Sequence, residues 1–401
     1  MTARHSIQTC LAGAVLLIAT ALAVAPAAAD DVVLRWNEIA QQTVAEAIPL
    51  SQSRSMAIAQ TAVLNAAAAA DAEGPAASVD AAVVTAAHDS LAVLVPDKAA
   101  ALDQALAADL ATVKDGAPKD RGVAIGRDAA AAVLGARKDD GAAATVSYAP
   151  KEQPGYWQPT PPKFASALGA QWSRVTPFVI QSADQFRPPA PAGIDSANYL
   201  AELRQVQEIG AANSSKRPPE KTDAAKFWVQ SGSQGWSVAA RQASLERKHT
   251  LLENAQNFAL LSSAIADALI ACFDAKYAYE LWRPVTALQA GVGDIASSPD
   301  WQPLIATPPF PAYPSGHACA AGAALTVLDR VYGPDGHKIT LTSTMAPGVT
   351  FSYGSFREIA DQIDDARVYG GIHTRQDQAA GRALGQAVAG YVLEKMGGPL
   401  P

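Results

Sequence analysis

The chain has 401 residues, enough for one large domain or for two or three ordinary ones. Hydrophobic residues make up 49% of it and the formal net charge is −7, which excludes a disordered chain and argues against a general nucleic-acid surface. Only 6% of the residues are aromatic, and much of the apolar content is alanine, a residue that favours helices over strands. The composition therefore predicts closely packed helices, and any anion site must be a local group of cations.

Residues 1–29 have the pattern of a signal peptide. Arg4 gives a positive start, residues 11–24 form an apolar run, and three small alanines stand at 27–29 before Asp30. The alternative is a membrane anchor, for which the apolar run is short. We therefore expect export to the periplasm or the extracellular space.

Residues 30–193 form the predicted N-terminal region. Apolar residues recur at helical spacing in five segments, 32–48, 54–72, 81–94, 99–113 and 119–137. Between 139 and 193 frequent prolines prevent long helices, whereas Trp157, Phe164 and Trp172 indicate burial. We expect this connection to wrap the protein in an ordered way, because flexible linkers lack such aromatic residues.

Residues 194–401 form the predicted C-terminal bundle, with helices expected at 196–209, 237–249, 251–279, 317–331, 353–368 and 373–396. The apolar segment 251–272 carries Glu253 and Asp267, which a bilayer core penalises, so we interpret it as a buried helix and expect no membrane span in the mature chain. The sequence contains no convincing β-hairpin and no glycine-rich nucleotide loop. The expected fold is all-α, with two helical bundles packed into one compact unit.

Two cysteines, Cys272 and Cys319, lie outside the signal peptide. An oxidising compartment favours one disulfide between them. The alternative is a pair of buried thiols that behave as small apolar residues. Neither cysteine is expected to be catalytic.

The first chemical motif is Lys276 followed by Arg283 and Pro284. A lysine and an arginine seven residues apart lie on one face of a helix, and Pro284 is expected to end that helix so that Arg283 turns inward. The alternative is a solvated basic stripe followed by a proline terminator.

The second motif spans 310–317 and reads Phe-Pro-Ala-Tyr-Pro-Ser-Gly-His, directly before an apolar helix. Ser315 is a good N-cap, and Gly316 lets a ligand approach the backbone closely. The N–H groups and the positive end of the helix dipole then face an anion, beside which His317 is placed for proton transfer. The alternative is an ordinary capped helix with a chance histidine.

The third motif contains Arg367, Gly370-Gly371, His373 and Asp377. The glycines break the helix between Arg367 and His373, and Asp377 then lies on the same helix face as His373. This spacing lets the Asp377 carboxylate accept a hydrogen bond from Nδ1 of His373. Nε2 of His373 is then free as a nucleophile or a metal ligand. The alternative is an exposed His–Asp pair that contributes less than about 1 kcal/mol.

Together the three motifs describe a pocket for a tetrahedral oxyanion. Lys276, Arg283 and Arg367 supply positive charge, while Ser315 and the Gly316 N–H supply further hydrogen bonds. Each charge-assisted bond contributes roughly 1.5–3 kcal/mol. One histidine is then available to attack or to coordinate, and the other to move protons.

The order and spacing of these residues resemble the vanadium-dependent haloperoxidase and type 2 phosphatidic acid phosphatase superfamily. The resemblance rests on Lys-x6-Arg-Pro, Pro-Ser-Gly-His and Arg-x5-His-x3-Asp, and it covers about residues 227–389. Segment 310–317, and Trp282 before Arg283, are most similar to the soluble secreted haloperoxidase branch. The N-terminal half is similar mainly in its helical character and its proline-rich crossing.

The resemblance implies a role for each motif residue. His373 is then the covalent vanadate ligand, or the phosphorylated nucleophile of a phosphatase, with Asp377 orienting it and His317 as the acid–base group. Phe310 matches an aromatic residue on the halide side of the pocket. A larger set is implied to bind the oxyanion: Lys276, Arg283, Ser315, Gly316, Arg367 and His373.

The leading function implied is a vanadium-dependent haloperoxidase that oxidises halide with hydrogen peroxide, with vanadate as the cofactor and Lys276 polarising the peroxide. Vanadate acts as a Lewis acid, so haem, flavin and nucleotide are not required. The first alternative is a secreted acid phosphatase that hydrolyses phosphomonoesters through phosphorylated His373, with phosphate in the same pocket. The second is a non-catalytic helical protein that captures oxyanions.

Two positions depart from the superfamily pattern. Ala366 stands where a serine usually precedes the arginine of the third motif, which removes at most one hydrogen bond. Ser231 stands where the chloroperoxidase-like branch has an aspartate shortly after a Phe-Trp pair, here Phe227-Trp228. We expect the missing carboxylate to lower the basicity of His317 and to loosen Arg283.

Overall fold

A computed structural model describes residues 31–230 and 232–398. The predicted signal peptide at 1–29 and the departure at Ser231 both lie outside the described residues, so the two expectations stay predictions.

The N-terminal region begins with helices, as the periodicity predicts. The carboxylate of Asp31 accepts the backbone N–H groups of Val33 and Leu34 and caps the first helix. That helix is shorter than the predicted 32–48, because Pro49 starts a new helix at a position where its missing N–H is not needed. The five helices are α1 (Val32–Thr43), α2 (Pro49–Ala72), α3 (Val79–Leu94), α4 (Ala99–Leu110) and α5 (Ala117–Arg137).

The connection from 138 to 196 is ordered although, among the described residues, it holds no α-helix. Its centre is tied to a buried carboxylate of the C-terminal region: Asp267 accepts the backbone N–H groups of Phe178, Val179 and Ile180 at 2.6, 2.7 and 2.9 Å. Trp157 is fully buried. Trp172 is buried as well, whereas Phe164 is 64% exposed, so the burial predicted for Phe164 is wrong.

The C-terminal region holds eight further α-helices within the described residues. They are α6 (Ala197–Ile209), α7 (Pro219–Phe227), α8 (Gly232–Arg247), α9 (Leu251–Tyr279), α10 (Pro284–Ala290), α11 (Gly316–Tyr332), α12 (Phe356–Tyr369) and α13 (Arg375–Met396). Among the described helices, α9 is long and apolar enough to cross a membrane, but 94% of its most apolar stretch is buried inside the protein. This burial is what we expect of a core helix.

A β-hairpin corrects the prediction of a purely helical pattern. Strand β1 (Asp335–Thr342) pairs antiparallel with β2 (Thr350–Ser355), where the sequence predicted a helix from 353 onward. Ile339 and Leu341 are buried and alternate with exposed neighbours, which is the period of a strand. The connection contains the turn dipeptide Pro347-Gly348, but at seven residues it is longer than the two-residue loop of a tight hairpin, and the sequence pattern was missed. Helix α12 begins only after Ser355 caps it.

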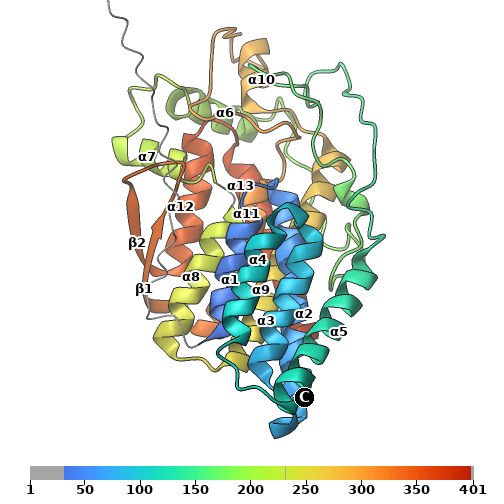
Figure 1. Cartoon of the computed structure of the whole chain (residues 1–401). Helices are drawn as coiled ribbons and strands as arrows, with labels where there is room; N and C mark the ends of the chain where they lie inside the picture. The colour runs from blue at the N-terminus through green and yellow to red at the C-terminus, as the bar shows by residue number, and fades with distance from the viewer. Residues whose placement is uncertain (1–30, 231, 399–401) are drawn as a thin grey trace, which may run out of the picture.

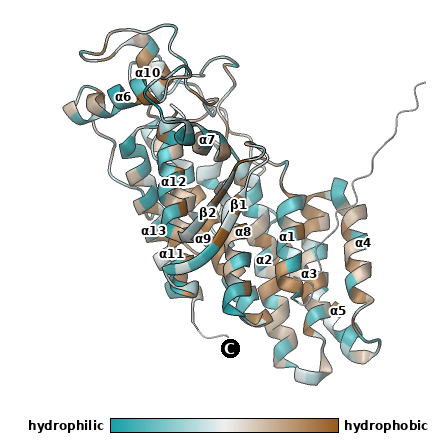
Figure 2. Cartoon of the chain, turned by 90° about the vertical axis from the view of Figure 1, so that its left-hand side faces the viewer, coloured by the Kyte–Doolittle hydropathy of each residue, from teal (hydrophilic) through white to brown (hydrophobic). Residues whose placement is uncertain are grey.

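One hydrophobic core joins the two regions. It includes residues of α1, α2 and α3 together with residues of α9, α11 and α13. Figure 1 shows α9 and α11 among the surrounding helices, and Figure 2 shows α1–α5 beside the C-terminal helices with the hairpin along their flank. The expected all-α class is confirmed apart from the hairpin, whereas the boundary at 193/194 stays a prediction.

Glycines bring the starts of α11 and α13 together. A β-carbon at Gly385 would lie 2.0 Å from the Cys319 carbonyl oxygen, and one at Gly381 would lie 2.6 Å from that of Ser315. No larger residue fits this contact, so the N-terminal ends of the two helices are held backbone to backbone.

Cys272 on α9 and Cys319 on α11 are both fully buried and are free thiols. The disulfide that the sequence favoured is therefore not present in this structure. The two residues fill the core as small apolar side chains do, which was the alternative interpretation.

Candidate active site

Three segments far apart in the sequence meet at the starts of α11 and α13. The backbone N–H of Ser315 donates to the carbonyl of Asp377 over 2.9 Å, and Arg283 Nη1 lies 3.1 Å from His373 Nε2. Arg283, Ser315 and Asp377 are all 0% exposed. The convergence on which the sequence prediction depends is therefore confirmed.

The route by which Arg283 reaches the site differs from the prediction. Lys276 and Arg283 do not share a helix, because α9 ends at Tyr279 where Glu280 adopts a left-handed conformation with φ 52°. Arg283 follows in an extended conformation as the N-cap residue of α10, and Pro284 starts that helix. A turn therefore directs Arg283 inward, and Pro284 does not terminate the helix that carries Lys276.

His373 and Asp377 form the predicted pair at the start of α13. His373 Nδ1 lies 3.0 Å from Asp377 Oδ2, which also accepts the N–H of Thr374 at 3.0 Å. Burial, and then the charge of Arg283, hold the pKa of His373 well below its ordinary value. Burial raises the pKa of Asp377 to about 6. His373 is therefore neutral, as a ligand or nucleophile must be.

Arg283 is held by the backbone on two sides. Its Nε donates to the carbonyl of Phe310 at 2.8 Å, and Nη1 donates to that of Ile372 at 3.0 Å as well as to His373. Its Nη2 is buried and has no hydrogen-bond partner among the described residues. Burial lowers the pKa of Arg283 to about 10, so it stays charged at neutral pH.

Backbone carbonyls that follow α7 hold the side chains of Arg367 and His317. Arg367 Nη1 donates to Trp228 at 2.5 Å, and His317 Nε2 donates to Gln230 at 3.1 Å. Arg367 Nε is buried without a partner in the part of the chain that the structure describes. Burial and the neighbouring Arg283 lower the pKa of Arg367 to about 9. Burial and the charge of Arg367 lower that of His317.

Lys276 holds the loop that presents the second motif. Its Nζ donates to the carbonyls of Pro311, Ala312 and Pro314 at 2.8, 2.9 and 2.5 Å, which uses all three ammonium protons. Burial lowers the pKa of Lys276 to about 8. Its charge lies within the site, but its predicted direct contact with an anion or a peroxide stays a prediction.

A small apolar cavity of about 70 Å³ lies against the second motif. Gly316 and His317 line it together with Phe310, whose ring centre is 5.0 Å from Arg283 Cζ. Further walls come from segments that the sequence did not link to the site, namely Leu50 at the start of α2 and Leu168 of the connection. The N-terminal half thus helps to enclose the site.

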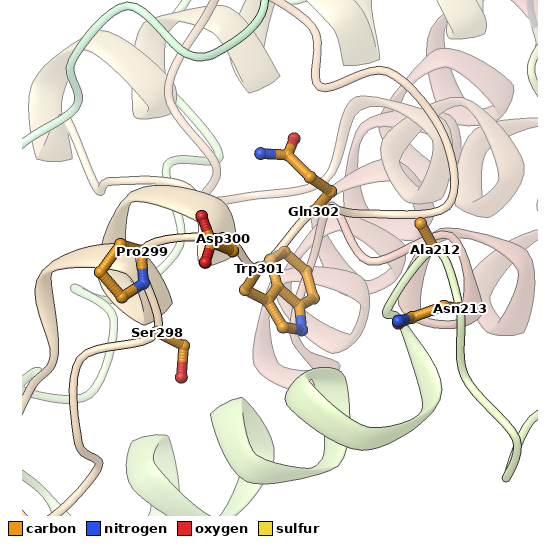
Figure 3. Close-up of a pocket in the computed structure, with 7 residues that line it drawn as sticks. All are labelled: Ala212, Asn213, Ser298, Pro299, Asp300, Trp301 and Gln302. Atoms are coloured by element: carbon orange, nitrogen blue, oxygen red, sulfur yellow. The ribbon is translucent and has the colours of Figure 1, made fainter.

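A second cavity, of about 520 Å³, lies around Trp301 (Figure 3). It is lined by Ala212, Asn213 and residues 298–302, and it contains none of the motif residues. The site that the motifs form is therefore separate from the cavity around Trp301.

Comparison with known proteins agrees with the motifs. A family model for the VCPO second helical-bundle domain matches residues 256–398. The vanadium chloroperoxidase of Curvularia inaequalis is 30% identical over 167 residues, which cover 34% of this chain and 27% of that protein. The vanadium-dependent bromoperoxidase of Corallina pilulifera is 32% identical over 99 residues, 22% of this chain and 17% of that one. The chain thus matches about a quarter or less of these relatives' length.

Solved structures extend the likeness to the whole fold. The crystal structure of a bacterial vanadium-dependent iodoperoxidase superimposes with a TM-score of 0.79 and 26% identity, covering 90% of this chain and 95% of that one. A bacterial vanadium-dependent chloroperoxidase in its holo form gives a TM-score of 0.71 at 19% identity over the same shares. The chloroperoxidase match shows a common fold.

Proposed function

We propose that this chain, which belongs to the vanadium haloperoxidase and type 2 phosphatidic acid phosphatase superfamily, is a haloperoxidase that holds vanadate at His373 and oxidises halide with hydrogen peroxide. The observation that supports it most is that two buried N–H donors, Arg283 Nη2 and Arg367 Nε, have no acceptor among the described residues and belong to the same site as a neutral histidine.

The residues present fit a multiply charged anion. Lys276, Arg283 and Arg367 are at most 3% exposed, and among the described carboxylates that of Asp377 acts on Lys276 and Arg283. Buried cations without enough counter-charge are unfavourable, and a buried donor without an acceptor costs about 1–3 kcal/mol. An oxyanion bound here would relieve both costs.

Each contact to that anion comes from a group already in place. His373 Nε2 would be the ligand atom, Arg283 Nη2 and Arg367 Nε would each donate a hydrogen bond, and Ser315 and the N–H of Gly316 would bind at the start of α11. Bound vanadate would supply the Lewis acidity that activates hydrogen peroxide toward a halide.

His317 would move the proton that this reaction requires. Its Nε2 donates to Gln230, so Nδ1 carries the lone pair that takes up a proton. Its lowered pKa keeps it neutral in the free protein, and the negative charge of a bound oxyanion would raise that pKa toward the working range. Asp377 keeps the proton of His373 on Nδ1 throughout.

The test uses purified protein freed of oxyanions and then supplied with vanadate, hydrogen peroxide and either iodide or bromide. We expect vanadate-dependent halide oxidation that inorganic phosphate inhibits by competition. His373→Ala should abolish both the activity and the competition. Arg187→Lys serves as the matched control, because Arg187 is an exposed residue that pairs with Asp274 outside the motifs. This variant should retain both the halide oxidation and the competition by phosphate.

Two other outcomes would assign the site differently. Hydrolysis of p-nitrophenyl phosphate without halide oxidation at any pH would favour the phosphatase. Tight phosphate binding without either activity would favour a binding protein. Halide oxidation that needs no vanadate would contradict the proposal outright.

We also propose that the protein is exported. The support is the sequence pattern of residues 1–29. Expression of the full chain, followed by mass spectrometry of the protein recovered outside the cytoplasm, should find an N-terminus at Asp30. Recovery of the unprocessed chain from the cytoplasm alone would contradict this.

A further inference from the structure

A cavity of about 420 Å³ lies directly outside the wall of the active site. It is formed by two segments, 160–165 of the connection and 306–309 of the loop before Phe310. Pro309 lines this outer cavity, and the next residue, Phe310, lines the inner one beside His317. The N–H of Leu168 donates to the carbonyl of Pro309 at 2.8 Å and joins the two segments at this wall. Neighbouring residues of the same two segments therefore line the two cavities.

The lining of the outer cavity is rigid and suited to a flat apolar group. Pro161, Pro162, Pro308 and Pro309 line it, and proline rings lose little conformational freedom when they pack against a ligand. Phe164, which lies between two lining residues, is 64% exposed with φ 45°. An exposed aromatic residue next in the chain to the lining residues of a proline-walled cavity offers a further surface on which a ring can pack.

Two polar side chains in the lining, Lys163 and Thr307, would orient a bound ligand. Lys163 lines it, is exposed, and forms no ion pair with any described residue. Thr307 lines it from the other segment, and its buried hydroxyl has no hydrogen-bond partner in the described part of the chain. A ligand that carries an anionic group and a hydroxyl would satisfy both residues.

We propose that this cavity binds the organic acceptor of the reaction, an electron-rich aromatic ring that bears a carboxylate. The inference rests on the proposed function, because halide and peroxide first give a hypohalous acid: X⁻ + H₂O₂ + H⁺ → HOX + H₂O. The acceptor then reacts as ArH + HOX → ArX + H₂O, in which the C–H bond breaks, the C–X bond forms, and the proton leaves as water. The volume exceeds that of a single substituted phenol and lies within the range of small-molecule sites.

The test compares 4-hydroxyphenylacetate with 4-hydroxyphenylacetamide, which has the same ring but no charge. Both compounds, at equal concentration, are halogenated once by the enzyme and once by added hypohalite. We expect the enzyme to favour the carboxylate about fivefold over the ratio that hypohalite gives. Lys163→Ala should return the ratio to the hypohalite value. Lys114→Ala, an exposed lysine without an ion pair among the described residues, should not.

Binding is measured separately, by saturation-transfer NMR on 4-hydroxyphenylacetate without vanadate or peroxide. Transfer is expected for the full protein and should be lost in Ala306→Trp, which fills the cavity while leaving acceptor-free iodide oxidation intact. No transfer, or a product ratio equal to that of hypohalite, overturns the acceptor site. An enzyme that oxidises no halide but still shows the transfer loses the proposed function and keeps the binding site, so the two failures are distinguishable.

Discussion

Arg283 Nη1 lies 3.1 Å from Nε2 of His373. A guanidinium group has no acceptor, so Nε2 must present its lone pair and the ring proton must lie on Nδ1, toward Asp377. The contact therefore fixes the tautomer of His373 before any anion arrives. It also places positive charge at the atom to which an oxyanion would bond.

Arg283→Lys should weaken vanadate binding. Lysine keeps the charge, but its three donors lie on a single nitrogen and cannot replace both Nε, which binds Phe310, and Nη1, which binds Ile372 and His373. The imidazole therefore loses its fixed orientation. We expect about a 10- to 100-fold higher vanadate concentration for half-maximal activation, the range found for partners of metal-ligating histidines. Activation curves of the anion-free protein measure it. An unchanged midpoint would mean that Arg283 does not orient the ligand.

Anion affinity should fall as the pH rises above about 8. The pKa of Lys276 is lowered to about 8 and that of Arg367 to about 9, so both are protonated below pH 8 and lose their charge above it. Bound anion favours the charged forms, so binding takes up protons in this window and weakens as they become scarce. Calorimetry with sulfate is the measurement, because sulfate keeps one charge state from pH 6 to 10. A flat dissociation constant across that range would contradict the prediction.

Local spacing explains which parts of the fold were predictable. The start of helix α9 at 251 was predicted correctly from its apolar period, and the structure shows a capping box of Thr250 and Glu253 there. Its end was less certain in the sequence, because the first motif predicted that the helix continues to Pro284, whereas α9 ends at Tyr279. The short helices α7 and α10 were missed. Each has a proline in its first turn, Pro219 and Pro284, and a proline that ends one pattern also starts the next helix.

In the site too, contacts between residues close in sequence were predictable, and contacts that depend on the fold were not. The His373–Asp377 pair and the Ser315 cap are contacts within four residues, and their spacing reveals them. The carbonyls of Trp228 and Gln230, which hold Arg367 and His317, carry no side-chain signature, so no sequence pattern marks them. The apolar walls likewise come from segments with no chemistry of their own, and only the fold brings them to the site.

Glu202→Gln should shift the acidic limb of the activity profile to lower pH. Glu202 on α6 accepts the N–H of Gln376 at 2.8 Å, and its charge is one of the influences that raise the pKa of Asp377. Asp377 must be ionised to accept the hydrogen bond from His373 Nδ1. Activity therefore falls as the pH drops through the pKa of Asp377. Removing the charge lowers that pKa, and activity should persist in more acidic solution. Glu208→Gln, in an exposed pair on the same helix, is the control.

The pH–rate profile separates this effect from simple damage to the helix. A structural loss would lower the rate at every pH and leave the midpoint in place. A midpoint equal in Glu202→Gln, Glu208→Gln and the parent protein would show that Glu202 does not act on Asp377.

Asp267→Asn should destabilise the whole protein and not only the connection that it holds. Its two carboxylate oxygens accept three backbone N–H groups, at 178, 179 and 180, and an amide would turn a donor toward at least one of them. A buried donor left without an acceptor costs roughly 1–3 kcal/mol. The same connection supplies Leu168 to the active-site cavity, so loosening it should also lower halide oxidation.

Asp274→Asn on the same helix is the matched control, because its carboxylate forms a partly exposed, two-bond ion pair with the side chain of Arg187. Losing this pair leaves groups that water can reach, so urea unfolding should show a smaller loss for this variant than for Asp267→Asn. If both variants lose the same free energy of unfolding, the three backbone contacts to Asp267 do not hold the connection in place. A loss confined to Asp267→Asn, with a proportionate fall in activity, links the order of the connection to the enclosure of the site.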